Sequence, residues 1–143
     1  STSSIIFPEG ISYSLENRLS NSLAEIDREQ MVQVISNLLK NGIEAMPNGG
    51  KLWVNLSDNH DWVSIHIKDQ GTGIESSDLE KVFEPFYTTK GIGKGTGLGL
   101  ATTYGIVKMH RGQIHVKSNA DPAKGPTGTE FIVHLPRRLV DSG

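Results

Sequence analysis

Three short motifs supply, in order along the chain, the groups that a nucleotide pocket needs. They are NLLKN at residues 37–41, DQGTGI at 69–74 and GTGLGL at 95–100. Asparagine oxygens are hard ligands suited to Mg²⁺, a carboxylate accepts a hydrogen bond from an exocyclic amine, and backbone N–H groups of a glycine-rich loop bind phosphates. Each motif alone is weak evidence for a nucleotide site, but the three together predict an ATP-binding pocket.

The first motif lies on a predicted helix that starts at a capping-box-like Asp27 and ends near Met46, before the turn sequence PNGG. One face of this helix is polar. Its members fall within about 100° of one another on a helical wheel: Gln33, Asn37, Lys40, Asn41 and Glu44. The amides of Asn37 and Asn41 can therefore face one cleft as Mg²⁺ ligands, and Lys40 can reach a phosphate. For this helix alone, a solvated polar face is the alternative.

The second motif follows a predicted buried strand that ends at Asp69. We expect Gly71 and Gly73 to let a flat ligand approach the backbone closely. The carboxylate of Asp69 would accept a hydrogen bond from the adenine amine, whereas the carbonyl of guanine would be repelled. The motif predicts ATP over GTP, with an ordinary strand-to-turn sequence as the alternative.

In the third motif, glycines occur at every second position from 91 to 99, directly before a predicted helix. The spacing fits neither a dinucleotide fingerprint nor a P-loop, because Lys94 is followed by Gly95. Backbone N–H groups and the positive end of the next helix would still attract phosphates, with charge added by Lys90 and Lys94. A flexible linker is the alternative.

The remaining pattern predicts one domain with helices on one face of a mixed sheet. Residues 1–9 are Ser-rich and expected to be loose, and Trp53 and Trp62 are expected to cover the other sheet face. The other predicted elements are strands at 11–15, 52–56, 63–67, 113–118 and 129–135, a short helix at 76–82, a mobile loop at 83–97 and a helix at 98–110.

Composition narrows the function classes. The net charge is −2 without a basic run, so no nucleic-acid or acidic-membrane partner is expected. The chain has no cysteine, which excludes disulfides and thiolate sites and is compatible with the cytoplasm. No membrane span or signal peptide is expected. The five histidines, His60, His66, His110, His115 and His134, lack metal-ligand spacing and are interpreted as structural or surface residues.

These motifs resemble the catalytic ATP-binding domain of bacterial sensor histidine kinases, within the GHKL or Bergerat-fold ATPases. The likeness covers about residues 27–136. Residues 37–45 resemble the N box, 69–74 the first glycine box, 83–90 the F box and 95–100 the second glycine box; Gly128-Thr129-Glu-Phe131 resembles the last box. Within the N and F boxes, the sequence is most similar to kinases of the nitrogen-regulation type.

The resemblance implies a two-layer α/β sandwich of about three helices on one face of a five-stranded mixed sheet. It implies that Asn41, helped by Asn37, binds Mg²⁺, that Asp69 binds the adenine amine, that Thr129 supports it through water and that 83–95 form an ATP lid. The residues assigned to nucleotide binding are Asn41, Ala45, Asp69, Gly71, Gly73, Ile74, Lys90, Lys94, Gly95, Thr96, Gly97, Leu98, Gly99, Leu100 and Thr129. Those assigned to catalysis are Asn37, Lys40, Asn41 and Lys90.

One departure within the wider family bears on chemistry. Relatives that hydrolyse ATP carry a water-activating Glu four residues before the magnesium Asn, where this chain has Asn37. An amide is a poor base at neutral pH, so hydrolysis should be slow. The resemblance implies transfer of phosphate to a His on a separate dimerisation domain, and then to a response regulator receiver domain.

No histidine of this chain has the expected acceptor context, so the fragment is expected to bind ATP without phosphorylating itself. Two alternatives stay open. One is another GHKL ATPase or a kinase that phosphorylates Ser on a partner. The other is a nucleotide-sensing interaction module without catalysis.

Overall fold

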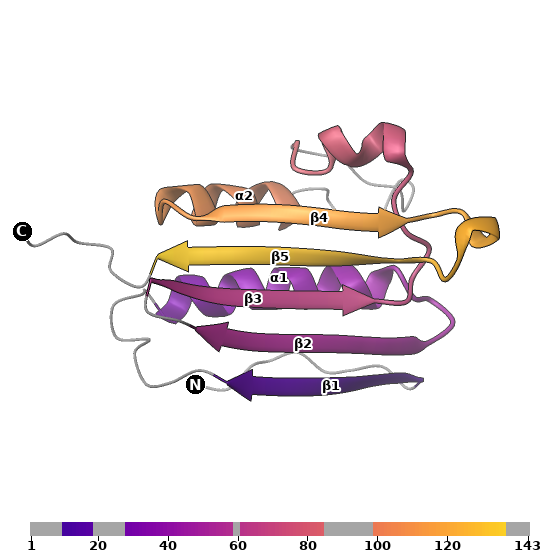
Figure 1. Ribbon diagram of the computed structural model, residues 1–143, viewed down its shortest axis with the longest axis horizontal. Helices are drawn as coiled ribbons and strands as arrows, with labels where there is room; N and C mark the ends of the chain where they lie inside the picture. Colours follow the sequence, from indigo (N-terminus) through magenta and orange to yellow (C-terminus); the bar gives the residue numbers. More distant parts are fainter. Residues whose placement is uncertain (1–9, 19–27, 59–60, 85–98, 137–143) are drawn as a thin grey trace, which may run out of the picture.

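The computed structural model describes residues 10–18, 28–58, 61–84 and 99–136. Five strands form one mixed sheet in the order β1-β2-β3-β5-β4, and α1 and α2 lie together on one face of it (Figure 1). Among the strand pairs of the described residues, only β1–β2 is parallel. The elements are β1 Ile11–Arg18, α1 Arg28–Glu44, β2 Gly50–Asp58, β3 Trp62–Asp69, the 3-10 helix η2 Ser76–Lys81, α2 Gly99–Met109, β4 Gln113–Asn119, the 3-10 helix η3 Pro122–Lys124 and β5 Gly128–Pro136. The predicted two-layer architecture is confirmed.

Helix α1 packs on the sheet through an apolar stripe at helical spacing. Met31, Val34 and Leu38 are buried against inward-facing residues of β2, β3 and β5. The PNGG sequence then turns the chain into β2, with Gly49 at φ +95°. A Cβ on Gly49 would lie 2.7 Å from the carbonyl oxygen of Gly10, so the turn requires glycine.

The strands alternate between a helix-covered face and an open face. On β3, Val63, Ile65 and Ile67 are buried under the helices, while the residues between them point to the open face. As expected, Trp53 and Trp62 lie opposite the aliphatic face; the ring of Trp53 has the ammonium groups of Lys51 and Lys68 at 5.2 and 5.5 Å. The main hydrophobic cluster therefore lies on the side of α1 and α2.

Several expectations fall on segments outside the described residues. They are the loose segment 1–9, the helix start at Asp27, and residues 85–98, which hold most of the expected lid together with Lys90, Lys94, Gly95, Thr96, Gly97 and Leu98. Elsewhere the predicted strands are correct and each extends by one to three residues at one or both ends. None of the helices in the described part of the chain has the length and apolar character needed to cross a bilayer.

Candidate nucleotide-binding site

Asp69, the last residue of β3, is the central residue of the candidate site. The residue is only 3% exposed, and its Oδ1 accepts hydrogen bonds from the backbone N–H of Gly71 at 2.7 Å and of Thr129 at 3.3 Å. Its Oδ2 lies near α1, where a Cβ on Gly42 would be 3.5 Å away. One carboxylate oxygen is thus held by two backbone donors, and the other lies on the side of α1.

Burial dominates the electrostatics of this carboxylate. Desolvation raises the pKa of Asp69, and the two backbone hydrogen bonds, from Gly71 and Thr129, oppose that shift only in part. A carboxylate whose charged form is destabilised by burial is strongly stabilised by a hydrogen-bond donor on a bound ligand. The position therefore fits recognition of an amine group.

Gly71 and Gly73 shape the loop after Asp69 by packing closely against protein. A Cβ on Gly71 would lie 2.5 Å from the carbonyl oxygen of Ala45, and one on Gly73, at φ +80°, would lie 2.1 Å from that of Asn119. We expected these glycines to give a ligand close access to the backbone. In the structure, their missing side chains make room for the end of α1 and the end of β4.

A hydroxyl network joins this loop to β4 and β5. The backbone N–H of Ile74 donates to Ser118 Oγ at 2.7 Å, and Ser118 Oγ lies 2.9 Å from both the carbonyl oxygen of Gly128 and Thr129 Oγ1. The hydroxyl of Thr127 donates to the carbonyl oxygen of Gly71 at 2.8 Å. Neither Ser118 nor Thr127 is among the residues predicted for the site, although Ser118 holds an inward position of a predicted strand where an apolar residue would be usual.

Helix α1 lines a second side of the site. Asn37 and Asn41, one turn apart on α1, and Ala45, directly after its last residue, are half-buried, whereas Lys40 is exposed. The carbonyl oxygen of Ala45 accepts a hydrogen bond from the backbone N–H of Thr72 at 3.3 Å. The end of α1 is therefore held directly against the loop that follows Asp69.

Asn37 contacts the start of α2. Its Nδ2 lies 3.3 Å from Thr103 Oγ1 and 3.4 Å from the carbonyl oxygen of Gly99, and it can donate to both. Leu100, one residue later, packs against the core. The structure thus brings Asp69, the two glycines, Ile74, Thr129 and Ala45 together at one end of β3, and brings Asn37 to Gly99 at the N-terminus of α2.

Three of the histidines meet on the open face of the sheet, which the sequence analysis did not predict. His66, His115 and His134 lie on the neighbouring strands β3, β4 and β5, with ring centroids 6.4 Å apart for His66–His134 and 6.1 Å for His115–His134. Strand register places these residues, which are distant in sequence, side by side. They remain surface residues, and His66 pairs with Glu130 at 3.2 Å.

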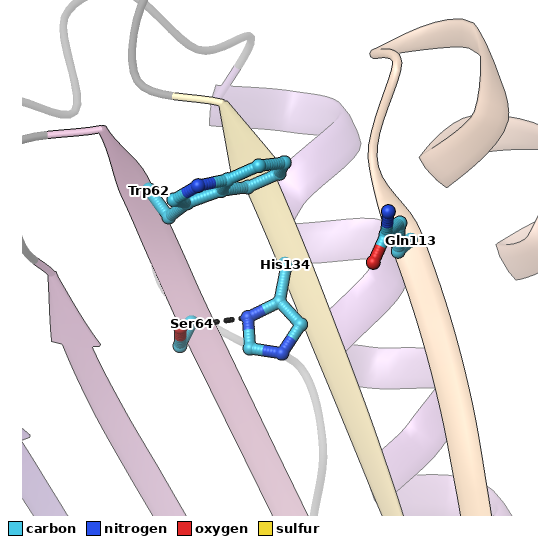
Figure 2. Close-up of a pocket in the computed structure, with 4 residues that line it drawn as sticks. All are labelled: Trp62, Ser64, Gln113 and His134. Carbon is cyan, nitrogen blue, oxygen red and sulfur yellow. Dashed lines mark hydrogen bonds between the residues drawn. The ribbon is translucent and has the colours of Figure 1, made fainter.

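The open face also has a hollow of about 320 Å³ beside this cluster, lined by Trp62, Ser64, Gln113 and His134 (Figure 2). His134 Nδ1 lies 2.9 Å from Ser64 Oγ. This hollow is on the sheet face opposite α1 and is separate from the Asp69 site. Within the described ranges, no group of three or more His, Cys, Asp or Glu side chains is arranged to hold a metal ion.

Comparison with known proteins gives the family. Residues 26–139 match the profile of the "Histidine kinase-, DNA gyrase B-, and HSP90-like ATPase" family. Sporulation kinase A of Bacillus subtilis is 42% identical over 112 residues, 78% of this chain and 17% of that protein; sensor kinase CckA of Brucella abortus is 40% identical over 128 residues, 79% of this chain and 13% of that protein. This chain thus spans less than a fifth of these relatives.

A solved structure agrees with the sequence matches. The nucleotide-free catalytic domain of histidine kinase ThkA superposes with a TM-score of 0.76 at 31% identity, covering 91% of this chain and 81% of that one. The finer likeness to kinases of the nitrogen-regulation type stays a prediction. The chain belongs to the histidine kinase-, DNA gyrase B- and HSP90-like ATPase family, and its sequence and fold are those of the catalytic ATP-binding domain of a two-component sensor histidine kinase.

Proposed function

We propose that the pocket at the end of β3 selects ATP through its adenine amine, and that residues 1–143 form one domain with a lid at 83–95. The observation that carries the proposal is the buried carboxylate of Asp69, whose Oδ1 is occupied by two backbone donors. Its Oδ2 would accept the N6 hydrogen of adenine. Guanine presents a carbonyl oxygen at that position, and two acceptors would face each other without a proton.

We propose that Asn41 holds Mg²⁺ with help from Asn37, next to the phosphates. Mg²⁺ commonly uses one or two protein oxygens and fills its other positions with phosphate and water, so two amides on α1 fit it. The contacts of Asn37 with α2 use its Nδ2, which leaves the amide oxygen as the ligand atom. When bound, the ion would neutralise charge on the phosphates; Lys40, Lys90 and Lys94 would add positive charge.

The γ-phosphate is proposed to be kept for a protein acceptor. Position 37 carries an amide, which cannot take a proton from water at neutral pH as a carboxylate would. The acceptor would be a His on a dimerisation domain, and the phosphate would pass from it to a response regulator receiver domain. Because ATP is available in the cytoplasm, we propose that the domain works there without nucleic-acid or direct membrane contact.

Phosphotransfer tests this proposal. The chain would be incubated with Mg²⁺ and ATP labelled at the γ-phosphate, alone and with the separately purified dimerisation domain of its parent protein. We expect no label on the chain alone and acid-labile label on the added domain. ATP binding without any transfer would favour a nucleotide-sensing module, and rapid release of phosphate without an acceptor would favour an ATPase.

A further inference from the structure

A buried polar contact joins the two long helices. α1 and α2 pack side by side beneath the sheet (Figure 1), and Asn37 meets Thr103 at this contact. Thr103 is 0% exposed, as is Val107 one turn later on the same face of α2. A hydroxyl at an otherwise apolar, fully buried helix position is costly unless it is hydrogen-bonded.

The hydrogen bonds of this contact form a closed triangle. Thr103 Oγ1 donates to the carbonyl oxygen of Gly99 at 2.9 Å and accepts from Asn37 Nδ2 at 3.3 Å, while Nδ2 also lies 3.4 Å from that same carbonyl oxygen. Thr103 thus uses its single proton on Gly99, which leaves its lone pairs to accept from the amide. Both neighbours of Nδ2 are acceptors, so the NH2 group, and not the oxygen, must face α2.

The triangle therefore fixes the orientation of the Asn37 amide. If the amide were flipped, its oxygen would face the carbonyl oxygen of Gly99 with no proton between them. With Nδ2 facing α2, Oδ1 projects from the other edge of the planar amide, away from these two acceptors. A valine at position 103 has the same shape as threonine and would fill the same space, but it would remove one of the two acceptors that select this orientation.

We propose that Thr103 is a positioning residue that acts through Asn37: it holds the Asn37 amide with its oxygen available to Mg²⁺ and ties the first turn of α2 to α1. This inference rests on the proposed function. If Thr103 has this role, nucleotide affinity divides into a part that depends on Thr103 and a part that does not. The contribution of the Asp69 pocket does not depend on Thr103, whereas the gain in affinity on adding Mg²⁺ does.

The test compares Thr103→Val with Thr103→Ser, which keeps the hydroxyl, and with Thr102→Val, an exposed neighbour on the same helix. Calorimetry would give the ATP dissociation constant with Mg²⁺ and with a chelator, and thermal denaturation would report stability. We expect Thr103→Val to reduce the Mg²⁺-dependent gain by about three- to tenfold, the size of one hydrogen bond, with unchanged affinity in chelator. Thr103→Ser and Thr102→Val should retain the full gain.

Two results would overturn the inference: an unchanged Mg²⁺-dependent gain in Thr103→Val, or an equal loss of affinity with and without Mg²⁺, which a purely structural role would give. If Thr103→Val does not fold, Thr103→Ala is read by the same two criteria. Failure of the wild-type chain to bind ATP under any condition would instead overturn the proposed function itself. Binding by the wild type together with an unaltered Thr103→Val would overturn only the role of Thr103.

Discussion

Asp69 and Thr129 face each other across β3 and β5, and the backbone N–H of Thr129 donates to Oδ1 of Asp69 at 3.3 Å. This sheet pairing holds a carboxylate inside the protein, although burial raises its pKa. The same oxygen accepts from Gly71, so the fold itself orients the carboxylate before any ligand arrives. The proposed recognition of adenine depends on this preorganisation.

Replacing Asp69 with Asn should weaken ATP binding without reducing the stability of the fold. Asparagine can keep Oδ1 as the acceptor for both backbone donors, but it removes the buried charge and places an NH2 group where Oδ2 was. We expect ATP affinity to fall by about 10- to 100-fold, because a charged hydrogen bond is lost and two donors then meet. The melting temperature at pH 7 should be unchanged or higher.

The pH dependence of the stability of Asp69→Asn tests whether the buried charge of Asp69 destabilises the fold. Because the native pKa of Asp69 lies above 3.8, the native state binds more protons than the unfolded state between that value and the native pKa. The contribution of Asp69 to stability must therefore fall as pH rises through this window. Denaturant titrations from pH 4 upward should show Asp69→Asn gaining stability relative to wild type. A variant that loses stability throughout would contradict this interpretation.

His134 should make the domain less stable in mild acid. Desolvation, and then the nearby His115 and His66, lower its pKa below 6.5. Between the native pKa and 6.5 the unfolded state binds more protons, so the contribution of His134 is fully present above pH 6.5 and is lost as pH falls toward the native pKa. Urea titrations at pH 7.5 and 5.5 should show that the free energy of unfolding falls less between these pH values in His134→Gln than in the wild type. Equal losses would rule out this role.

Ser118→Ala should destabilise the fold and weaken ATP binding, because Ser118 supports the loop after Asp69. The change leaves the backbone N–H of Ile74 without the acceptor that lies at 2.7 Å and removes the partner of the Thr129 hydroxyl. We expect a loss of about 1–3 kcal/mol in the free energy of unfolding, together with weaker ATP binding. The exposed Ser77 provides the control, and Ser77→Ala should change stability by less than about 0.5 kcal/mol. Matching effects in the two variants would refute the network.

Two glycine-to-alanine substitutions should change the stability of the fold in opposite directions. Gly73→Ala puts a Cβ 2.1 Å from the carbonyl oxygen of Asn119 at φ +80°, so it should destabilise the fold by more than about 1 kcal/mol and disturb the loop after Asp69. Gly105 lies inside α2 and a Cβ there would meet nothing within 4 Å. Gly105→Ala should therefore stabilise the fold by up to about 1 kcal/mol. Thermal denaturation of both variants decides this, and a stabilised Gly73→Ala would be inconsistent with the loop packing.

Local periodicity was enough to predict the elements that carry the site. The apolar spacing of Met31, Val34 and Leu38 located α1, and the alternation of aliphatic residues located the β2–β3 hairpin with Asp69 at its end. Such patterns depend on neighbours along the chain. They assign each residue to a face, but they do not say which residue of another element it meets.

What sequence reasoning missed depends on pairing between distant segments. Ser118 meets Thr129, and His134 meets His66 and His115, only because β5 lies between β3 and β4 in one specific register. The contact of Asn37 with Thr103 spans 66 positions and depends on how α1 and α2 pack. The local sequence does not identify these partners: even a polar residue at an inward position, such as Ser118, does not show which residue of another element it meets.

The most direct test of the central claim is calorimetric titration of the wild-type chain with ATP and with GTP, both in the presence of Mg²⁺. If Oδ2 of Asp69 reads the exocyclic amine of adenine, ATP should bind at least about tenfold more tightly than GTP, and Asp69→Asn should lose this preference. Equal affinities for ATP and GTP in the wild-type chain would contradict the account.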